Sequence, residues 1–288
     1  MNIESLRGLH FAFIGSGTMA RAIIHALVNT GKLPQDTIVA SDPLSSQREM
    51  LQDDFGIKIS EHNVGAVQDA NIILLCVKPQ VMPTVLKDLH TCIQSNALVI
   101  SIVAGMPIAT ISTGLDHAFV VRTMPNTPAQ IGEGMTVWTA APGVSQKQRD
   151  QARAILQLMG TELYVKHENA LDMATAVSGT GPTYVFLMME ALIDAAVHLG
   201  FSRSQGRLLV EQTVLGSVQF AKKSNLHMAQ LRNMVTSPGG TSAEAVYQME
   251  KGSLRTIYSK AVWAAYQKSR LLGEKANEPI DAPLKVDK

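Results

Sequence analysis

The pattern of apolar residues changes once along this chain, near residue 166, and this change limits the possible folds more than any other feature. Before it, short apolar runs alternate with helical patterns, and residues 72–77 are apolar throughout, as in a parallel strand buried on both faces. After it, strand patterns stop and helical patterns continue. Strands that alternate with helices indicate a doubly wound sheet. The sequence therefore predicts an α/β fold, with a doubly wound sheet in residues 1–166, an all-helical domain in residues 167–273 and a flexible tail in residues 274–288.

Apolar periodicity and turn residues give the expected elements. The strands are residues 9–14, 37–40, 57–59, 72–77, 98–103, 119–122, 135–139 and 161–165. The helices are residues 18–29, 145–159, 168–177, 182–199, 203–223 and 242–272, with a possible break in the last one at Gly252.

The expected helix over residues 182–199 is the most apolar one and requires a partner. Residues 184–189 read Tyr-Val-Phe-Leu-Met-Met, so the helix is apolar nearly all round and must be buried on most sides. A small helical domain has limited means of burying such a helix by itself. We therefore expect a second copy of the chain to cover it, which makes this a dimerisation domain and the protein a homodimer or a larger homo-oligomer.

Composition and charge limit the other partners. The net charge is +1, which offers no basic footprint for nucleic acid. The first ten residues lack the apolar core of a signal peptide, and no segment has the roughly 18 uncharged apolar residues of a membrane span. Cys76 and Cys92 both lie in apolar stretches, without the spacing of a metal clip or a redox pair. We expect a cytoplasmic protein with buried thiols, no bound metal and no membrane or nucleic-acid partner.

A glycine-rich turn follows the first expected strand and opens the first helix. Residues 15–20 read Gly-Ser-Gly-Thr-Met-Ala, the G-x-G-x-x-A form of the dinucleotide fingerprint. Gly15 permits the tight turn, Gly17 lets a pyrophosphate approach the backbone, and Ala20 lets the helix pack closely on the strand. The amides at the helix start then face the phosphates. In this context the doubly wound domain is predicted to be Rossmann-like and to bind a nicotinamide dinucleotide.

The residues expected to meet the ribose of the dinucleotide lie at the end of the second expected strand. Asp42 suits the free 2′-hydroxyl of NADH and repels the 2′-phosphate of NADPH, whereas Ser41, Arg48 and Asn63 could support a phosphate. Asp42 before Pro43 also fits a plain turn residue. The sequence therefore leaves the choice between NADPH and NADH open.

Four further motifs lie in a characteristic order along the chain. They are Arg-Thr-Met-Pro-Asn-Thr-Pro at 122–128, Gly-Glu-Gly-Met-Thr at 132–136, Ser-Gly-Thr-Gly-Pro at 178–182 and Thr-Ser-Pro-Gly-Gly-Thr-Ser at 236–242. Together with the fingerprint, this set resembles the pyrroline-5-carboxylate reductases over residues 11–273. The resemblance implies hydride transfer from NADPH, with NADH as the alternative, to the imine carbon of 1-pyrroline-5-carboxylate, giving L-proline in the final step of proline biosynthesis. It also implies a helical domain that interlocks with its dimer mate.

The resemblance implies the site residues as well. The implied cofactor contacts are Gly15, Ser16, Gly17, Thr18, Met19, Ala20, Ser41, Asp42, Asn63, Val77, Lys78, Pro79 and Ala104. The implied substrate contacts are Glu168, Gly239, Gly240, Thr241 and Ser242, with Ser242 as the catalytic residue. Three residues depart from the common family pattern: Asp42 replaces a small neutral residue, Ser242 a threonine and Met234 a polar residue.

The residue types from Gly239 to Ser242 also predict an anion site without the resemblance. Two glycines before a helix start can offer successive backbone amides to a carboxylate, and the Ser242 hydroxyl can reach an imine nitrogen. Thr241 and Glu244 match a capping box, which explains them without catalysis. We expect both roles to hold, with Thr241 as the helix cap and the loop before it as the anion site.

Two other roles and two other activities stay open. Arg122 binds either a phosphate or a carboxylate of the fold, and Lys78 either frames the cofactor or is a solvated charge. The other activities are reduction of a hydroxy acid or another cyclic imine, and dinucleotide sensing without turnover. Hydroxy-acid enzymes of this kind generally use a lysine in the second domain. Here Lys222 and Lys223 lie late in an expected helix, which argues against activity on a hydroxy acid.

Overall fold

The computed structural model describes residues 3–276 and contains one sheet of 8 strands. The strands are β1 (Phe11–Ile14), β2 (Ile38–Ser41), β3 (Lys58–Ser60), β4 (Ile72–Leu75), β5 (Leu98–Ser101), β6 (Val120–Met124), β7 (Gly134–Ala140) and β8 (Gly160–Tyr164). Their order is β3-β2-β1-β4-β5-β6-β7-β8, and all neighbouring pairs are parallel except β6 with β7. The first six strands follow the order of a dinucleotide-binding Rossmann sheet. The predicted fold class is confirmed.

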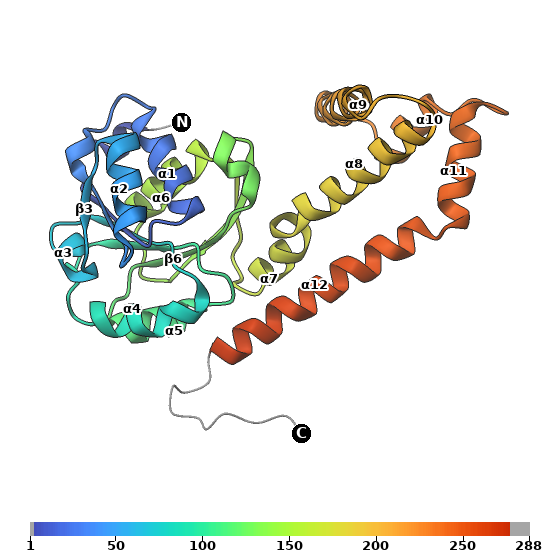
Figure 1. Ribbon diagram of the computed structural model, residues 1–288. Helices are drawn as coiled ribbons and strands as arrows, with labels where there is room; N and C mark the ends of the chain where they lie inside the picture. Colours follow the sequence, from blue (N-terminus) through green and yellow to red (C-terminus); the bar gives the residue numbers. More distant parts are fainter. Residues whose placement is uncertain (1–2, 277–288) are drawn as a thin grey trace, which may run out of the picture. The chain divides into compact units, whose positions relative to one another are not determined.

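Helices cover both faces of the sheet and form two apolar cores (Figure 1). One face carries α1 (Thr18–Val28), α2 (Ser45–Phe55) and α6 (Gln146–Leu158), and the other carries α3 (Asn63–Val67), α4 (Met82–Leu89) and α5 (Ile108–Leu115). Strand residues such as Phe13 and Leu74 face the first core, and Ile14 and Leu75 face the second. The continuously apolar runs in the sequence thus reflect strands that are buried on both faces.

The helical half follows the last strand. It contains α7 (Ala170–Ala174), α8 (Gly181–His198), α9 (Arg203–Lys223), α10 (Met228–Met234), α11 (Thr241–Lys251) and α12 (Leu254–Ala276). A π-helix, η5 (Thr175–Gly179), joins α7 to α8. The break expected at Gly252 is present, because Gly252 ends α11 and Ser253 adopts a positive φ of 58° before α12 begins. The short helix α10 was not predicted.

The chain divides into two compact units at positions that differ from the expected boundary at residue 166. The first unit extends to Thr180 and includes the chain from Ala265 onward, and the second comprises Gly181–Ala264. The difference arises because α7 and η5 pack against β6 and β7, and because the last part of α12 contacts Gly105 after β5 and Asp172 of α7. The helix α12 reaches Ala276, and the rest of the predicted tail lies outside the described residues.

The helix α8 exposes much of its apolar surface in a single chain. None of its residues is buried, and Phe186 and Leu187 are 62% and 65% exposed. Exposed apolar area of this kind marks an interaction surface. None of the helices in residues 3–276 is long and apolar enough to cross a membrane, and the cytoplasmic location stays a prediction.

Candidate functional site

The turn between β1 and α1 has the geometry that a dinucleotide fingerprint requires. Gly15 has a φ of +94°, and a Cβ atom on it would lie 2.9 Å from the carbonyl oxygen of Cys76, so only glycine fits. Gly17 is the N-cap of α1, and a Cβ atom there would meet nothing within 4 Å. Gly15 therefore allows the turn, and Gly17 leaves open space in front of the first amides of α1.

Ser16, between these glycines, provides a test of whether a phosphate fits here. Its side chain is 2% exposed, and its hydroxyl has no hydrogen-bond partner in the described part of the chain. A buried hydroxyl without a partner costs free energy and suggests that a ligand atom satisfies it. Since the helix start favours an anion, the residues present fit the pyrophosphate of a dinucleotide.

A cavity of about 1100 Å³ lies along the carboxyl ends of β1, β2 and β4. The predicted cofactor residues that line it are Gly15, Gly17, Ser41, Asp42, Asn63, Val77 and Lys78. Ser16, Met19, Ala20, Pro79 and Ala104 lie outside its lining, and Thr18 lines a separate cleft beside Arg21 and His25. The structure thus brings the residues from three distant motifs together at the edge of the sheet where ligands bind in such folds.

Asp42 is held rigidly at the end of β2. Its Oδ2 accepts a hydrogen bond of 2.9 Å from the backbone N–H of Ser16, and its Oδ1 accepts one of 3.0 Å from that of Leu44. The Arg48 guanidinium donates to the backbone carbonyls of Asp42 and Pro43, at 2.6 Å and 3.1 Å. Asp42 is therefore a turn residue that also lines the cavity, and its contact with the ribose stays a prediction.

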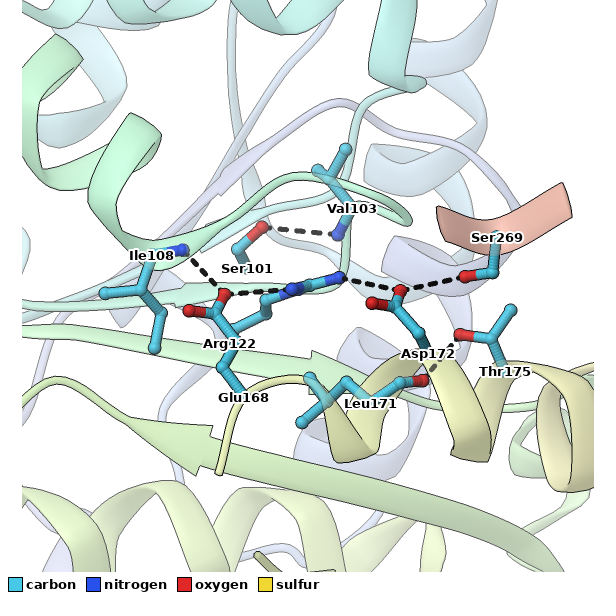
Figure 2. A network of polar contacts seen from close by, with 9 residues as sticks. All are labelled: Ser101, Val103, Ile108, Arg122, Glu168, Leu171, Asp172, Thr175 and Ser269. Atoms are coloured by element: carbon cyan, nitrogen blue, oxygen red, sulfur yellow. Dashed lines mark hydrogen bonds and ion pairs between the residues drawn. The ribbon is translucent and has the colours of Figure 1, made fainter. Parts of the chain in front are cut away.

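The Arg122 side chain lies in a network of carboxylates (Figure 2). It is 7% exposed and forms ion pairs with Glu168 at 2.8 Å and with Asp172 at 3.7 Å. Glu168 Oε1 also accepts from the backbone N–H of Ile108 at 2.8 Å, and Asp172 accepts from the Ser269 hydroxyl at 2.9 Å. Of the two interpretations of Arg122, the structure supports binding to carboxylates of the fold.

This network fastens distant parts of the first unit to β6. Arg122 belongs to β6, Ile108 begins α5, Asp172 belongs to α7 and Ser269 lies near the end of α12. The hydrogen bonds to Glu168 all use its Oε1, and Oε2 has no partner among the described residues. No local pattern points to Asp172 or Ser269, because their partners are remote along the chain.

Asn126 is a further residue whose role the motif did not reveal. Its amide nitrogen donates to the carbonyl of Ser178 in η5 at 3.1 Å, and its amide oxygen accepts from the N–H of Met135 in β7 at 2.8 Å. Asn126 thus connects β7 to the π-helix that leads into α8. A π-helix is rare and is frequently found at functional sites.

The glycine-rich loop before α11 lies in the second unit. The N-cap of α11 is Gly240, with no side-chain cap, and Thr241 is already the first helical residue. The expected capping box is therefore wrong. The backbone carbonyl of Gly240 accepts from the N–H groups of Ala243 and Glu244, while the Glu244 side chain accepts from Gln248 at 2.9 Å.

The two glycines of this loop differ in what a side chain would meet. A Cβ atom on Gly240 would lie 2.5 Å from the Ser237 hydroxyl oxygen and 3.2 Å from the Ser237 carbonyl oxygen, so a side chain there would require Ser237 to shift. Gly239 has a φ of +70°, and a Cβ atom there would meet nothing within 4 Å. The first amides of α11 have no intrahelical acceptor, as at any helix start. The loop can therefore accept a carboxylate, with the approach open at Gly239.

The expectation of buried thiols holds in part for Cys76, which is half-buried and lines the cavity. Burial raises the pKa of the Cys76 thiol, which keeps it protonated. Cys92 is exposed, because it lies in the turn after α4, where Thr91 takes a φ of 60°. The expectation for Cys92 was wrong.

The Rossmann-like sheet, the phosphate-binding turn and the cavity beside it define a dinucleotide-dependent oxidoreductase. Residues 10–105 match the family described as "NADP oxidoreductase coenzyme F420-dependent", and residues 168–272 match "Pyrroline-5-carboxylate reductase dimerisation". The chain belongs to the pyrroline-5-carboxylate reductase family. It is 40% identical over 268 residues to a Pseudomonas aeruginosa pyrroline-5-carboxylate reductase, covering 93% of this chain and 98% of the relative.

Two further relatives agree with this assignment. A pyrroline-5-carboxylate reductase from Synechocystis is 40% identical, covering 93% of this chain and 99% of the relative. The crystal structure of Plasmodium falciparum pyrroline carboxylate reductase with NADP bound matches with a TM-score of 0.84 and 32% identity, covering 93% of this chain and 99% of that one. The match to a dimerisation family supports a homo-oligomer, and α8 with its exposed apolar surface lies within the matched residues.

Proposed function

We propose that this protein reduces 1-pyrroline-5-carboxylate to L-proline, the final step of proline biosynthesis. One hydride from a reduced nicotinamide dinucleotide adds to the imine carbon, and one proton adds to the imine nitrogen, so that the C=N bond becomes a C–N bond. The observation that carries this proposal is the 40% identity to pyrroline-5-carboxylate reductases over 93% of the chain. Both glycine-rich motifs are intact within that length.

The first unit binds and orients the cofactor. The turn at Gly15 and Gly17 receives the pyrophosphate, with the amides of α1 and the Ser16 hydroxyl as donors. Lys78 and Val77 line the cavity at the end of β4 and hold the dinucleotide along the sheet edge. When bound, the dinucleotide supplies the hydride, and the chain supplies position and electrostatics.

The second unit binds the substrate through the loop before α11. The backbone N–H groups at the helix start donate to the substrate carboxylate, and the glycines keep this approach free of side chains. Ser242 follows directly in the first turn of α11 and is half-buried. Its hydroxyl has no hydrogen-bond partner among the described residues, so it is available to the imine nitrogen or to a water molecule there. Glu168 serves as a further substrate contact in this proposal.

Both NADPH and NADH act as hydride donors in this proposal. The NADP-bound relative supports NADPH, and Asp42 beside the cavity supports NADH. The active form is a homodimer or a larger ring of dimers, in which the apolar surface of α8 is covered by a second copy.

The test is a substrate panel assayed with the purified full-length chain. Oxidation of each reduced cofactor is followed with 1-pyrroline-5-carboxylate, with a six-membered cyclic imine carboxylate and with several 2-oxo acids. We expect the highest kcat/KM for 1-pyrroline-5-carboxylate. A folded protein that turns over only a 2-oxo acid, or that binds cofactor without turning over any substrate, would contradict the proposal.

A further inference from the structure

The phosphate turn, residues Gly15–Gly17, is joined to the end of β2 by two hydrogen bonds. The N–H of Gly15 donates to the backbone carbonyl of Ser41 at 2.8 Å, and the N–H of Ser16 donates to the carboxylate of Asp42 at 2.9 Å. The first bond joins backbone atoms, so any residue at position 41 would supply its acceptor. The second bond is made by the Asp42 side chain, so it depends on the residue type at this position.

The Asp42 carboxylate is fixed by a second hydrogen bond. Its other oxygen accepts from the backbone N–H of Leu44 at 3.0 Å, two residues further along the chain. An aspartate that accepts from the second residue after it forms a local turn, here in the segment between β2 and α2. The carboxylate therefore bridges this local turn and the phosphate turn, where Ser16 is 26 positions away in the sequence.

Ser16 depends on this bond because it is buried. The residue is 2% exposed, so its N–H has little access to water if the Asp42 oxygen is removed. A buried N–H without an acceptor costs free energy, and the turn would shift until that N–H finds another partner. The Ser16 hydroxyl, which has no partner among residues 3–276, would shift with it, and so would the start of α1. These are the groups that bind the pyrophosphate in the proposed function.

Charge and position predict opposite effects of Asp42 on a bound pyrophosphate. A carboxylate repels the phosphates, so its charge alone predicts that a neutral residue at this position strengthens binding. A carboxylate that holds the turn predicts that a neutral residue too short to reach Ser16 weakens binding. Since NADH and NADPH carry the same pyrophosphate, the second effect applies to both cofactors, whereas a contact with the ribose hydroxyls would favour NADH alone.

We infer that Asp42 is a positioning residue that keeps the phosphate turn in its binding geometry, for NADH and NADPH alike. This inference deepens the proposed function and rests on it for the class of cofactor. Asp42 acts through Ser16 and the first N–H groups of α1, which meet the pyrophosphate. Its role in the turn is separate from the predicted contact with the ribose.

The test measures Kd by calorimetry in the full-length protein, with no substrate present, for NADH, NADPH and 2′-deoxyadenosine 5′-diphosphate. The last probe carries a diphosphate but neither a 2′-hydroxyl nor a 2′-phosphate, so it reports on the turn without the ribose contact. In Asp42→Ser the hydroxyl can still accept from the Leu44 N–H, which preserves the local turn, but the side chain is one bond shorter and no longer reaches Ser16. We expect the Kd of all three ligands to rise about tenfold, the factor that corresponds to one hydrogen bond to a charged group.

A second measurement and a control variant isolate the turn. The Ser16 amide hydrogen should exchange with solvent faster in Asp42→Ser than in the native protein, because it has lost its acceptor. Glu61 lines the same cavity, but it bonds to none of residues 15–17 within the described part of the chain. Glu61→Gln therefore removes a charge without touching the turn, and it should leave the Kd of the diphosphate probe unchanged or lower it.

Three results would overturn the inference. Asp42→Ser could bind the diphosphate probe or NADPH as tightly as the native protein or more tightly, the Ser16 amide could exchange at the native rate, or Glu61→Gln could weaken probe binding equally. Binding of both cofactors without reduction of pyrroline-5-carboxylate would instead refute the proposed function and leave these comparisons of Kd meaningful.

Discussion

The buried Arg122 network offers a stability prediction that the structure makes quantitative. In Arg122→Ala the carboxylates of Glu168 and Asp172 lose their shared cation, and their side chains are only 33% and 19% exposed. Removing one partner of a buried ion pair costs about 3–5 kcal/mol, because a charge stays behind without compensation. Since Glu168 keeps partial contact with water, we take the lower end, about 3 kcal/mol.

A loss of this size is easily measured by thermal and urea unfolding. In a protein of this length it lowers Tm by roughly 6–12 °C, at about 2–4 °C per kcal/mol. Glu168→Gln should cost less, about 1 kcal/mol, because its amide oxygen can still accept from Ile108 and Arg122 retains Asp172. A larger loss of free energy of unfolding in Arg122→Ala than in Glu168→Gln would show that the uncompensated charges, and not only the lost contacts, destabilise the protein.

A matched control comes from a surface pair in the same unit. Arg7 lies 3.4 Å from Glu4, with side chains 76% and 63% exposed. Arg7→Ala should change the free energy of unfolding by at most about 1 kcal/mol, as for other exposed pairs. If Arg122→Ala destabilises the protein no more than Arg7→Ala does, the network contributes nothing beyond a surface contact and the reasoning fails.

Two further predictions concern assembly and thiol reactivity. Val185→Asp in α8 should dissociate or unfold the protein, because Val185 is 41% exposed in the single chain and the proposed oligomer would bury the new charge without a partner, at a cost of several kcal/mol; light scattering that shows the same oligomer and melting temperature as the native protein would contradict this. Cys92 should react with a thiol reagent in the native protein well before Cys76, whose raised pKa keeps it a neutral thiol at pH 7. Peptide mapping of the labelled protein checks the order, and equal labelling of both cysteines would refute it.

The sequence predicts the sheet well because each strand carries its own local signal. The apolar run containing β4 is buried on both faces, and the glycine turn before α1 has one geometry that fits. Gly252 ends α11 at the expected place for a similar reason, because the glycine that ends the helix is itself visible in the sequence. Elements with local causes are therefore readable from the chain alone.

The short helix α10 shows where local patterns mislead. Its N-cap is His227, whose Nδ1 accepts from the N–H of Ala229 at 3.1 Å, with Gln230 bonding back. Histidine is outside the usual set of capping residues, so the start signal went unrecognised. At α11 the opposite happened: Thr241 and Glu244 match a capping box, but a turn closed by Gly240 N–H to the Ser237 carbonyl starts the helix one residue earlier.

The candidate site depends on contacts that no spacing rule provides. Ser16 and Asp42 are 26 positions apart, Arg122 and Glu168 are 46 apart, and Asp172 and Ser269 are 97 apart. The two residues of each pair come into contact because of the order of the strands in the sheet and the return of the chain through α12. Residue types alone therefore left two interpretations for Arg122, which only its partners could resolve.

The loop before α11 yields a last prediction, which separates a structural role from a chemical one. Thr241 does not cap the helix, so Thr241→Ala should leave Tm nearly unchanged. Ser242→Ala should also leave Tm nearly unchanged, because the Ser242 hydroxyl has no partner among the described residues, but it should lower kcat/KM roughly tenfold if one hydrogen bond of about 1.4 kcal/mol to the reacting nitrogen is lost in the transition state. Ser242→Thr keeps the hydroxyl and should remain active. Kinetics and melting curves of the three variants decide the matter: full activity in Ser242→Ala would show that the imine nitrogen is bound by water or by another group, and a lowered melting temperature would show that Ser242 stabilises the helix start.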